Sequence, residues 1–457
     1  MPTLAVDRDE LFAALGKTYT EHEFDELCFL FGVELDDVTS EYEEATKSST
    51  SKLSKEELAK LSKNVVYKID VPANRYDLLC LEGLARALRV FLRDVDSPLY
   101  TKSDQCVETM TVMKANTDTV RPFVVCAIMR GLTFTPARYQ SFIELQDQLH
   151  RNLCRHRTLV AIGTHDLDTV KGPFKYDARL PSDICFVPLT HDKFEGNSAQ
   201  LLDLYLQDPH YKHLKPYVPI IHTSSLYPVV LDSNETVLSL PPIINGAHSK
   251  ITLDTRNVFV ECTATDLTKA NIVLDTVLCM FSEYCSTPFQ VEPVQVNYVD
   301  SGGNTMQSYT SPVLELRQEC AKVDFVNSLI GMNLSADEMV QLCEKLQLAP
   351  AKVIQDGSAI QVTVPPTRSD ILHPVDIAED LGIAYGYNNL VWKVPTTCTV
   401  GGEQPLNHLG DLLREEVSPF NQTRIIILIL SLVIYSILIL FYPTLLYRFL
   451  VQDTLKS

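Results

Sequence analysis

Apolar residues recur at helical spacing in two widely separated segments of the chain, one near residue 20 and one near residue 335. Each segment opens with a hydroxyl residue followed three positions later by Glu, Thr20 with Glu23 and Ser335 with Glu338. This pattern predicts a capping box, in which the two residues satisfy each other's backbone N–H groups at a helix start. The apolar residues that share one helical face are Phe24, Leu27, Cys28 and Phe31 in the first segment, and Met339, Leu342, Cys343 and Leu346 in the second.

An alternating apolar pattern follows each of these helices and predicts a half-buried strand, at residues 65–71 and at residues 360–364. Both strands run into a similar phrase, VPANRYDLL from Val71 and VPPTRSDIL from Val364. Proline ends the strand there, and a helix is expected after the Asp. Two matched helix-strand-turn-helix blocks in one order indicate an internal repeat. The first copy is longer because of an acidic, Ser/Lys-rich stretch at residues 41–63, which is typical of a solvated loop.

Between the two copies, residues 110–300 mix strand-like apolar runs with helices. We expect strands at residues 123–129, 158–162, 228–231 and 258–262 and a helix at residues 137–155. Polar residues within or beside such runs often line a pocket. The candidates here are His165, Ser239, Asn245, Glu261 and Thr263. For each one alone, a structural hydrogen bond is the competing interpretation.

The composition is that of a globular chain with two to four domains, because 457 residues exceed one compact core. The net charge of −19 argues against a free-standing nucleic-acid-binding protein, since phosphate affinity depends on clustered Lys and Arg. A local basic face or a partner subunit would still allow RNA to be held. None of the 12 cysteines stands in a CxxC pair, which indicates reduced, buried thiols in a cytosolic protein. The first residues do not show the pattern of a signal peptide.

A run without charged residues extends from Ile425 to Tyr447 near the C-terminal end of the sequence. As a helix it would be about 34 Å long, enough to cross a hydrocarbon core of ~30 Å. A transmembrane-like helix at residues 424–451 is therefore one interpretation. A buried core helix fits poorly, because the run is apolar on every face. The third interpretation is that the chain is truncated or that its gene model is wrong at this end, and this one is favoured over a membrane anchor.

The strongest candidate for chemistry is a set of four carboxylates in the second copy. Asp376, Glu379 and Asp380 stand at positions i, i+3 and i+4, so a helix places them on one face, and Asp370 lies in the turn before them. Four converging carboxylates without a nearby Lys or Arg would repel one another unless a cation such as Mg²⁺ lies among them. The alternative is that acids favour a helix start through its dipole.

The first copy helps to choose between these interpretations. It has Gly83, Arg86 and Ala87 where the second copy has the three helical acids, so the shared fold does not require them. This difference favours a metal site, with Asp370, Asp376, Glu379 and Asp380 as its ligands. The sequence contains neither a nucleotide-binding Gly-rich loop nor a nucleophile elbow.

Five phrases carry a resemblance to a known family: VPANRYDLLCLEGLARAL, IGTHDLDT, PPIING, ECTATD and VPPTRSDILHPVDIAEDLGIAYGYNN. With them the chain resembles, in order from Met1 to about Val417, the β subunit of phenylalanyl-tRNA synthetase of the eukaryotic cytosolic and archaeal type. The resemblance implies an α₂β₂ enzyme that joins phenylalanine to its tRNA with ATP and Mg²⁺. It also implies that the α subunit holds the aminoacylation site, that the β subunit contributes to tRNA binding, and that its central module hydrolyses tyrosine misattached to tRNA.

Carried over to this sequence, the resemblance implies magnesium ligands at the four carboxylates. It implies an editing cleft around Ser239, Asn245, Glu261 and Thr263, with His165 nearby. The sequence departs from the family after about Val417, where a further catalytic-like module is expected, and this puts assembly with the α subunit in doubt.

The expected fold class is α+β and multidomain, with two related helix-strand-turn-helix modules flanking a central mixed α/β editing-type domain, plus a C-terminal apolar helix. The expected boundaries are 1–100 for the first copy, 110–300 for the central domain, 308–393 for the second copy, 394–423 for a linker and 424–451 for the apolar helix. A cytoplasmic synthetase β subunit is the leading hypothesis. The competing one is a non-catalytic adaptor, anchored in a membrane through residues 425–447.

Overall fold

The computed structural model describes residues 2–47, 62–394, 396–397 and 401–417, which divide into two units. The first unit extends from Met1 to Leu390 and the second from Val391 to Ser457. Within the described part of the second unit there is one helix, α13 (Pro405–Val417). No described helix is long and apolar enough to cross a membrane. The expected apolar helix at 424–451 lies outside the described residues.

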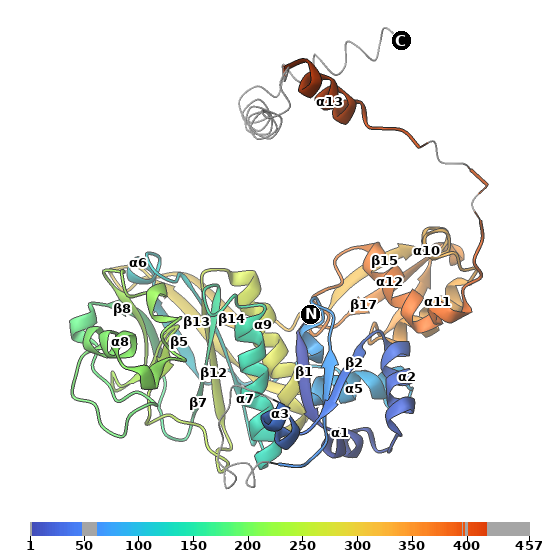
Figure 1. Ribbon diagram of the computed structural model, residues 1–457. Coiled ribbons are helices and arrows are strands. Elements are labelled where there is room, and N and C mark those ends of the chain that lie inside the picture. Colours follow the sequence, from blue (N-terminus) through green and yellow to red (C-terminus); the bar gives the residue numbers. More distant parts are fainter. Residues whose placement is uncertain (1, 48–61, 395, 398–400, 418–457) are drawn as a thin grey trace. The chain divides into compact units, whose positions relative to one another are not determined.

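The first repeat forms a three-stranded antiparallel sheet, ordered β1-β3-β2, with helices packed against it (Figure 1). The predicted capping box is confirmed, since Thr20 Oγ1 accepts from the Glu23 N–H and the Glu23 carboxylate accepts from the Thr20 N–H. Its elements are β1 (Thr3–Asp7), α1 (Arg8–Leu15), α2 (Glu21–Phe31), β2 (Glu34–Thr39), α3 (Glu41–Lys47), β3 (Val66–Asp70) and α5 (Leu81–Phe91).

Apart from α3, the second repeat has the same element order, and it has the same strand order, β15-β17-β16, which confirms the internal repeat. Its capping box at Ser335 and Glu338 is also confirmed. Its elements are β15 (Arg317–Lys322), α10 (Val323–Ile330), α11 (Ala336–Lys345), β16 (Ala351–Ile354), β17 (Ala359–Val364) and α12 (Pro374–Tyr385). In both copies the first helix ends at a glycine with positive φ, Gly16 and Gly331.

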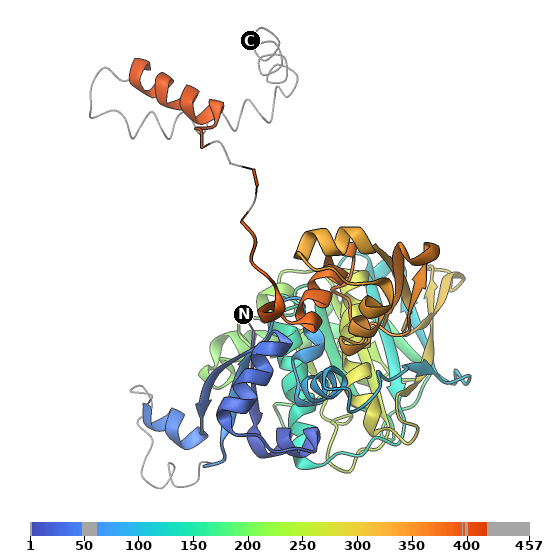
Figure 2. The same cartoon turned by 90° about the vertical axis from the view of Figure 1, so that its right-hand side faces the viewer.

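The two repeats contact each other through equivalent helices (Figure 2). Helix α2 of the first copy packs against α12, and its counterpart in the second copy, α11, packs against α5. Because α5 and α12 are themselves counterparts, the contact has the form of a two-fold interface within one chain.

The central domain is built on an 11-stranded sheet whose main path runs β11-β10-β9-β8-β5-β13-β6-β12-β7, with β4 and β14 also paired to β13. The sheet curves into a nearly closed barrel (Figure 1). Its strands are β4 (Thr101–Lys102), β5 (Thr109–Met113), β6 (Phe123–Met129), β7 (Val160–Asp166), β8 (Phe174–Arg179), β9 (Tyr227–Leu231), β10 (Val237–Leu240), β11 (Ile244–Asn245), β12 (Val258–Ala264), β13 (Gln290–Val299) and β14 (Thr305–Ser311). Its helices are α6 (Lys114–Thr117), α7 (Pro136–Arg151), α8 (Ser198–Gln207) and α9 (Leu267–Phe281).

One continuous apolar core joins the first repeat to the central domain. It extends from Phe24 and Leu88 through Phe142 of α7 and Phe281 of α9 to the strands β6 and β12. The predicted helix at 137–155 ends earlier than expected, at Arg151, because Asn152 leaves helical geometry with φ −92° and ψ −89°. Of the described cysteines, eight are buried and three, Cys106, Cys185 and Cys320, are exposed, so burial is confirmed for most of them.

A buried carboxylate joins α9 to the segment after β14 and makes stability depend on pH. Burial raises the pKa of Asp275 to about 7, against the opposing effects of the Leu314 N–H and Lys102. The folded chain therefore holds a proton that the unfolded chain has lost between pH ~4 and ~7, and the free energy of unfolding falls as pH rises through this window. We expect the free energy of unfolding of Asp275→Asn, relative to that of wild type, to rise by about 2–3 kcal/mol between pH 5 and pH 8, as measured by urea denaturation. The exposed control Asp118→Asn should show no such trend. If the difference in free energy of unfolding between Asp275→Asn and wild type did not change with pH, the raised pKa of Asp275 would be contradicted.

Candidate functional site

A pocket of about 320 Å³ lies where the two ends of the central sheet approach each other. Strand β11 ends one side of the sheet path and β7 ends the other. Side chains bridge this seam: Ser239 Oγ donates to Glu261 Oε1 over 2.8 Å, and Asn245 Nδ2 donates to the Thr164 carbonyl over 3.4 Å. The structure therefore brings Ser239, Asn245 and Glu261 together in the wall of one pocket. That this pocket is an editing cleft stays a prediction.

Glu261 is a buried carboxyl residue among the residues that line this pocket. Its side chain is 1% exposed, and its Oε2 atom has no hydrogen-bond partner within the described residues. On the facing strand, Gly163 lies directly opposite Glu261, and a Cβ there would stand only 2.2 Å from Oε1. Glycine at this position thus makes room for a buried carboxylate that has hydrogen-bonding capacity to spare.

The other two predicted residues of the cleft, His165 and Thr263, lie behind the pocket lining. Both are fully buried on strands β7 and β12. His165 Nδ1 shares a 2.8 Å hydrogen bond with Ser249 Oγ, and its Nε2 is 3.9 Å from Glu261 Oε1. Thr263 lies two residues beyond Glu261, on the same face of β12, and does not line the pocket. His165 therefore lies next to Glu261 although it is not itself in the pocket lining.

Two residues of this region were not predicted from the sequence. His150 lines the pocket and accepts the Ile162 N–H through Nε2 at 3.0 Å. Arg121 is buried and donates to the carbonyl oxygens of Arg157, Thr158, Leu159 and Thr263. Burial lowers the pKa of Arg121, and this is partly offset by Tyr176 and Glu261. Both residues stand far from Glu261 in the sequence, so only the strand pairing could have placed them here.

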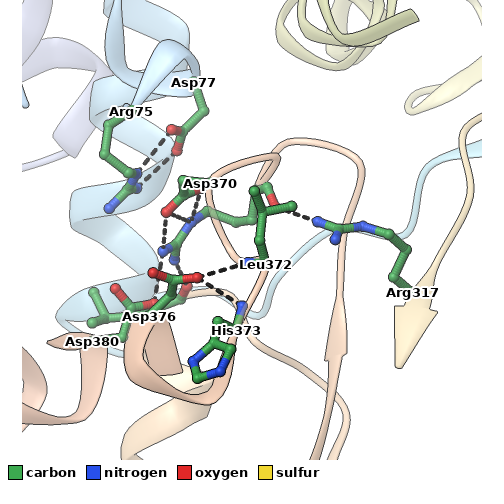
Figure 3. A network of polar contacts seen from close by, with 10 residues as sticks. Arg75, Asp77, Arg317, Asp370, Leu372, His373, Asp376 and Asp380 are labelled. Atoms are coloured by element: carbon green, nitrogen blue, oxygen red, sulfur yellow. Dashed lines mark hydrogen bonds and ion pairs between the residues drawn. The ribbon is translucent and has the colours of Figure 1, made fainter. Parts of the chain in front are cut away.

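The four carboxylates of the second repeat are arranged differently from what the sequence led us to expect, because a buried arginine lies among them. Arg368 is fully buried, and its Nη2 lies 2.8 Å from Asp370 Oδ2 and 2.7 Å from Asp380 Oδ2. Figure 3 shows Asp370 next to the corresponding pair of the first repeat, Arg75 and Asp77, whose atoms are 2.8 Å apart. The premise of four carboxylates without a nearby Lys or Arg is therefore wrong.

The other two carboxylates do not point into this pair. Asp376 Oδ2 accepts the N–H groups of Leu372 and His373, each over 2.8 Å, and so caps α12 (Figure 3). Glu379 is exposed on the helix surface. The dipole alternative considered from the sequence accounts for Asp376, while the ion pair accounts for Asp370 and Asp380.

The charges in this cluster do not balance fully. Burial would raise the pKa of Asp370, but Arg368 holds it below the usual value. Burial raises the pKa of Asp380 to about 6, in spite of Arg368 and Arg75. One arginine thus serves two buried carboxylates, which leaves Asp380 incompletely compensated.

These residues fit a divalent cation only in part. No group of three or more His, Cys, Asp or Glu side chains in the described ranges is arranged to hold a metal ion. Asp370 and Asp380 both form ion pairs with the Arg368 guanidinium group. Of the four candidate carboxylates, Asp376 and Glu379 have no ion pair within the described residues. Magnesium at these residues stays a prediction.

Three family models match this chain. Residues 1–94 match the Phe-tRNA synthetase beta subunit B1 domain, residues 139–286 the B3/4 domain and residues 321–387 the tRNA synthetase B5 domain. These matches cover the first repeat, much of the central domain with its pocket, and the second repeat.

Relatives match across the domains. The human phenylalanine–tRNA ligase beta subunit is 49% identical over 420 residues, which cover 92% of this chain and 69% of the relative. A cytoplasmic phenylalanine–tRNA ligase beta subunit of Arabidopsis thaliana is 49% identical over 430 residues, covering 93% and 69%. The crystal structure of an N-terminal fragment of the phenylalanyl-tRNA synthetase beta subunit from Pyrococcus horikoshii superposes with a TM-score of 0.70 at 28% identity, covering 84% of this chain and 99% of that fragment.

Proposed function

The chain belongs to the family of phenylalanine–tRNA ligase β subunits, and from this premise we propose how its domains serve an aminoacyl-tRNA synthetase. It pairs with an α subunit, in an α₂β₂ assembly, to support ATP- and Mg²⁺-dependent charging of tRNA(Phe), with ATP bound at the α-subunit site. The seam pocket of the central domain hydrolyses tyrosine misattached to that tRNA. Since the Arabidopsis relative is named cytoplasmic, we propose the cytoplasm as the place of action.

The observation that carries the editing proposal is the unpartnered Oε2 atom of Glu261 in the wall of the pocket. Tyrosine differs from phenylalanine by one hydroxyl group, and a carboxylate oxygen is an acceptor for a phenolic proton. A site with a buried polar group that only the hydroxyl can satisfy rejects the analogue without it, by factors of about 10⁴ in favourable cases. Glu261 therefore gives the pocket a means to hold tyrosine and refuse phenylalanine.

The chemistry that fits the pocket is hydrolysis of an ester by water. The oxygen of the water adds to the ester carbonyl carbon, the bond to the ribose oxygen breaks, and the water's proton passes to that oxygen, which yields tyrosine and free tRNA. Ser239 already donates its hydroxyl proton to Glu261 at 2.8 Å, so we assign it to holding the carboxylate. The residues of the pocket need only position the acyl group and the water.

The experiment is deacylation of Tyr-tRNA(Phe) by the full chain co-expressed with its α subunit. We expect the pair to co-purify, to charge tRNA(Phe) with phenylalanine, and to release tyrosine from preloaded Tyr-tRNA(Phe) faster than phenylalanine from Phe-tRNA(Phe). A complex that charges tRNA and releases both amino acids at the uncatalysed rate would overturn the editing part. Failure to bind the α subunit would overturn the proposal of a ligase subunit for this chain.

Magnesium at the second repeat is a separate proposal with its own test. If Asp376 and Glu379 bind Mg²⁺, millimolar Mg²⁺ raises the melting temperature of the full chain by a few degrees, because a ligand that binds only the folded state stabilises it. The double variant Asp376→Asn/Glu379→Gln should lose this response. Asp324→Asn/Asp337→Asn removes two exposed charges of the same repeat and should keep it. An equal response in all three proteins would show that Mg²⁺ acts elsewhere.

A further inference from the structure

His150 is a buried group in the pocket wall whose hydrogen bonding is incomplete. It lies in the last turn of α7 and is 6% exposed. Its Nε2 accepts the Ile162 N–H at 3.0 Å, while its Nδ1 has no partner among the residues that the structure describes. A ring nitrogen that accepts an N–H carries no proton, so the neutral ring holds its one proton on Nδ1.

The surroundings of His150 keep the ring neutral. Burial, together with the positive charges of Arg157 and Arg121, holds the pKa of His150 well below its usual value. A second proton would have to go to Nε2, where it would meet the Ile162 N–H. The Nδ1–H group is therefore a fixed donor at physiological pH.

The bond to Ile162 has a structural reason of its own. Among the described strands, β7 pairs with β12 alone, so every second residue of β7 turns its N–H and C=O away from β12. His150 satisfies one of these outward N–H groups and Asn245 one of the outward carbonyls. This hydrogen bond uses Nε2 and leaves Nδ1 as a buried donor without a partner among the described residues, which is unfavourable unless a ligand or water accepts from it.

Three buried polar atoms of the pocket-lining residues have no partner in the described chain: the donors His150 Nδ1 and Arg157 Nε, and the acceptor Glu261 Oε2. A hydroxyl group both donates and accepts, whereas a carboxylate can only accept and a neutral Nδ1–H can only donate. A single hydroxyl group in this pocket would satisfy both, accepting from His150 Nδ1–H and donating to Glu261 Oε2.

We propose that His150 is a specificity-determining residue of the pocket, whose Nδ1–H donates to the phenolic oxygen of the acyl group while Glu261 accepts the phenolic proton. The inference rests on the proposed function of the pocket and deepens it by naming the group that is read. The aryl ring without a hydroxyl leaves both His150 and Glu261 unsatisfied.

The test uses the full chain and two stable analogues, the 3′-amides of tyrosyl-adenosine and phenylalanyl-adenosine, titrated calorimetrically. Wild type should prefer the tyrosyl analogue. His150→Phe should lose on the order of tenfold in affinity for that analogue and keep its affinity for the phenylalanyl one. His150→Gln should recover the preference, because its amide can both accept from Ile162 and donate. His210→Phe, an exposed control outside the pocket, should match wild type.

An NMR measurement on the wild-type chain tests the same inference without relying on the folding of the variants. With ring-¹⁵N-labelled histidine, the Nδ1 resonance of His150 should shift when the tyrosyl analogue binds and stay in place with the phenylalanyl analogue. If His150 only caps the edge of β7, His150→Phe weakens both analogues equally and the resonance shifts with neither or with both, which would overturn the inference. If wild type binds neither analogue, the proposed function of the pocket fails first.

Discussion

Replacing Glu261 by Ala is expected to lower the rate of Tyr-tRNA(Phe) hydrolysis by the assembled enzyme on the order of 100-fold, measured as kcat/KM for deacylation. The expected size follows from losing a charge-assisted hydrogen bond to the phenol, worth about 1.5–3 kcal/mol, in a buried site. The variant also leaves Ser239 without its acceptor. Tyrosine should then accumulate on tRNA(Phe), while charging with phenylalanine stays at the wild-type rate.

Two controls separate recognition from a general loss of structure. Glu235→Gln changes an exposed carboxylate of the same domain, paired with Lys175 and Arg179 outside the pocket, and should leave deacylation unchanged. Glu261→Gln keeps the size of the side chain but places an amide where the phenolic proton would go, and should fall between wild type and Glu261→Ala. Wild-type deacylation by Glu261→Ala would remove Glu261 from the site.

Arg368→Met is expected to destabilise the first unit by about 3–5 kcal/mol, measured by urea denaturation at pH 7. The substitution fills a similar space but leaves Asp370 and Asp380 buried without their cation. It also removes the 2.7 Å hydrogen bond from Arg368 Nη1 to the Leu346 carbonyl. Lowering the pH should restore part of the loss, because protonated carboxyl groups no longer need the arginine.

The internal repeat provides a matched control for this variant. Arg75 occupies the same place in the first copy and pairs with a single carboxylate, Asp77, so Arg75→Met should cost clearly less than Arg368→Met. The exposed Arg151→Met should have no measurable effect. Equal losses for Arg75→Met and Arg368→Met would contradict the larger role assigned to Arg368.

The repeat could be predicted from the sequence because its signals are local. Capping boxes at Thr20 and Ser335 and apolar spacing within one helix need only a few consecutive residues, and both were confirmed. The central sheet could not be predicted in this way. Its path pairs β5 with β13 and brings its two end strands, β11 and β7, near each other. These strands are distant in the sequence, so their placement leaves no local signal.

The candidate site shows the same division. Ser239 and Glu261 could be singled out as polar residues in apolar strands, but their contact depends on the seam. His150 was missed because its partner Ile162 and its pocket neighbour Glu261 lie on other elements. The error at the carboxylates has a different cause: Arg368 stands only two residues before Asp370, and the Arg-x-Asp spacing is itself a local signal, repeated at Arg75 and Asp77.

The two-fold contact between the repeats has a consequence for how the copies differ. In a homodimer one sequence must serve both sides of the interface, whereas joined copies are free to specialise. Arg86 of α5 donates to the Cys279 and Met280 carbonyls and pairs with Glu283, which fastens the first copy to the central domain. The matching position in α12 is the exposed Glu379, and the next one, Ala87 in the first copy, is Asp380 in the second. Because the two copies are joined in one chain, their residues at these positions can differ. The first copy binds the central domain through Arg86, whereas the second copy has the acidic residues Glu379 and Asp380 there.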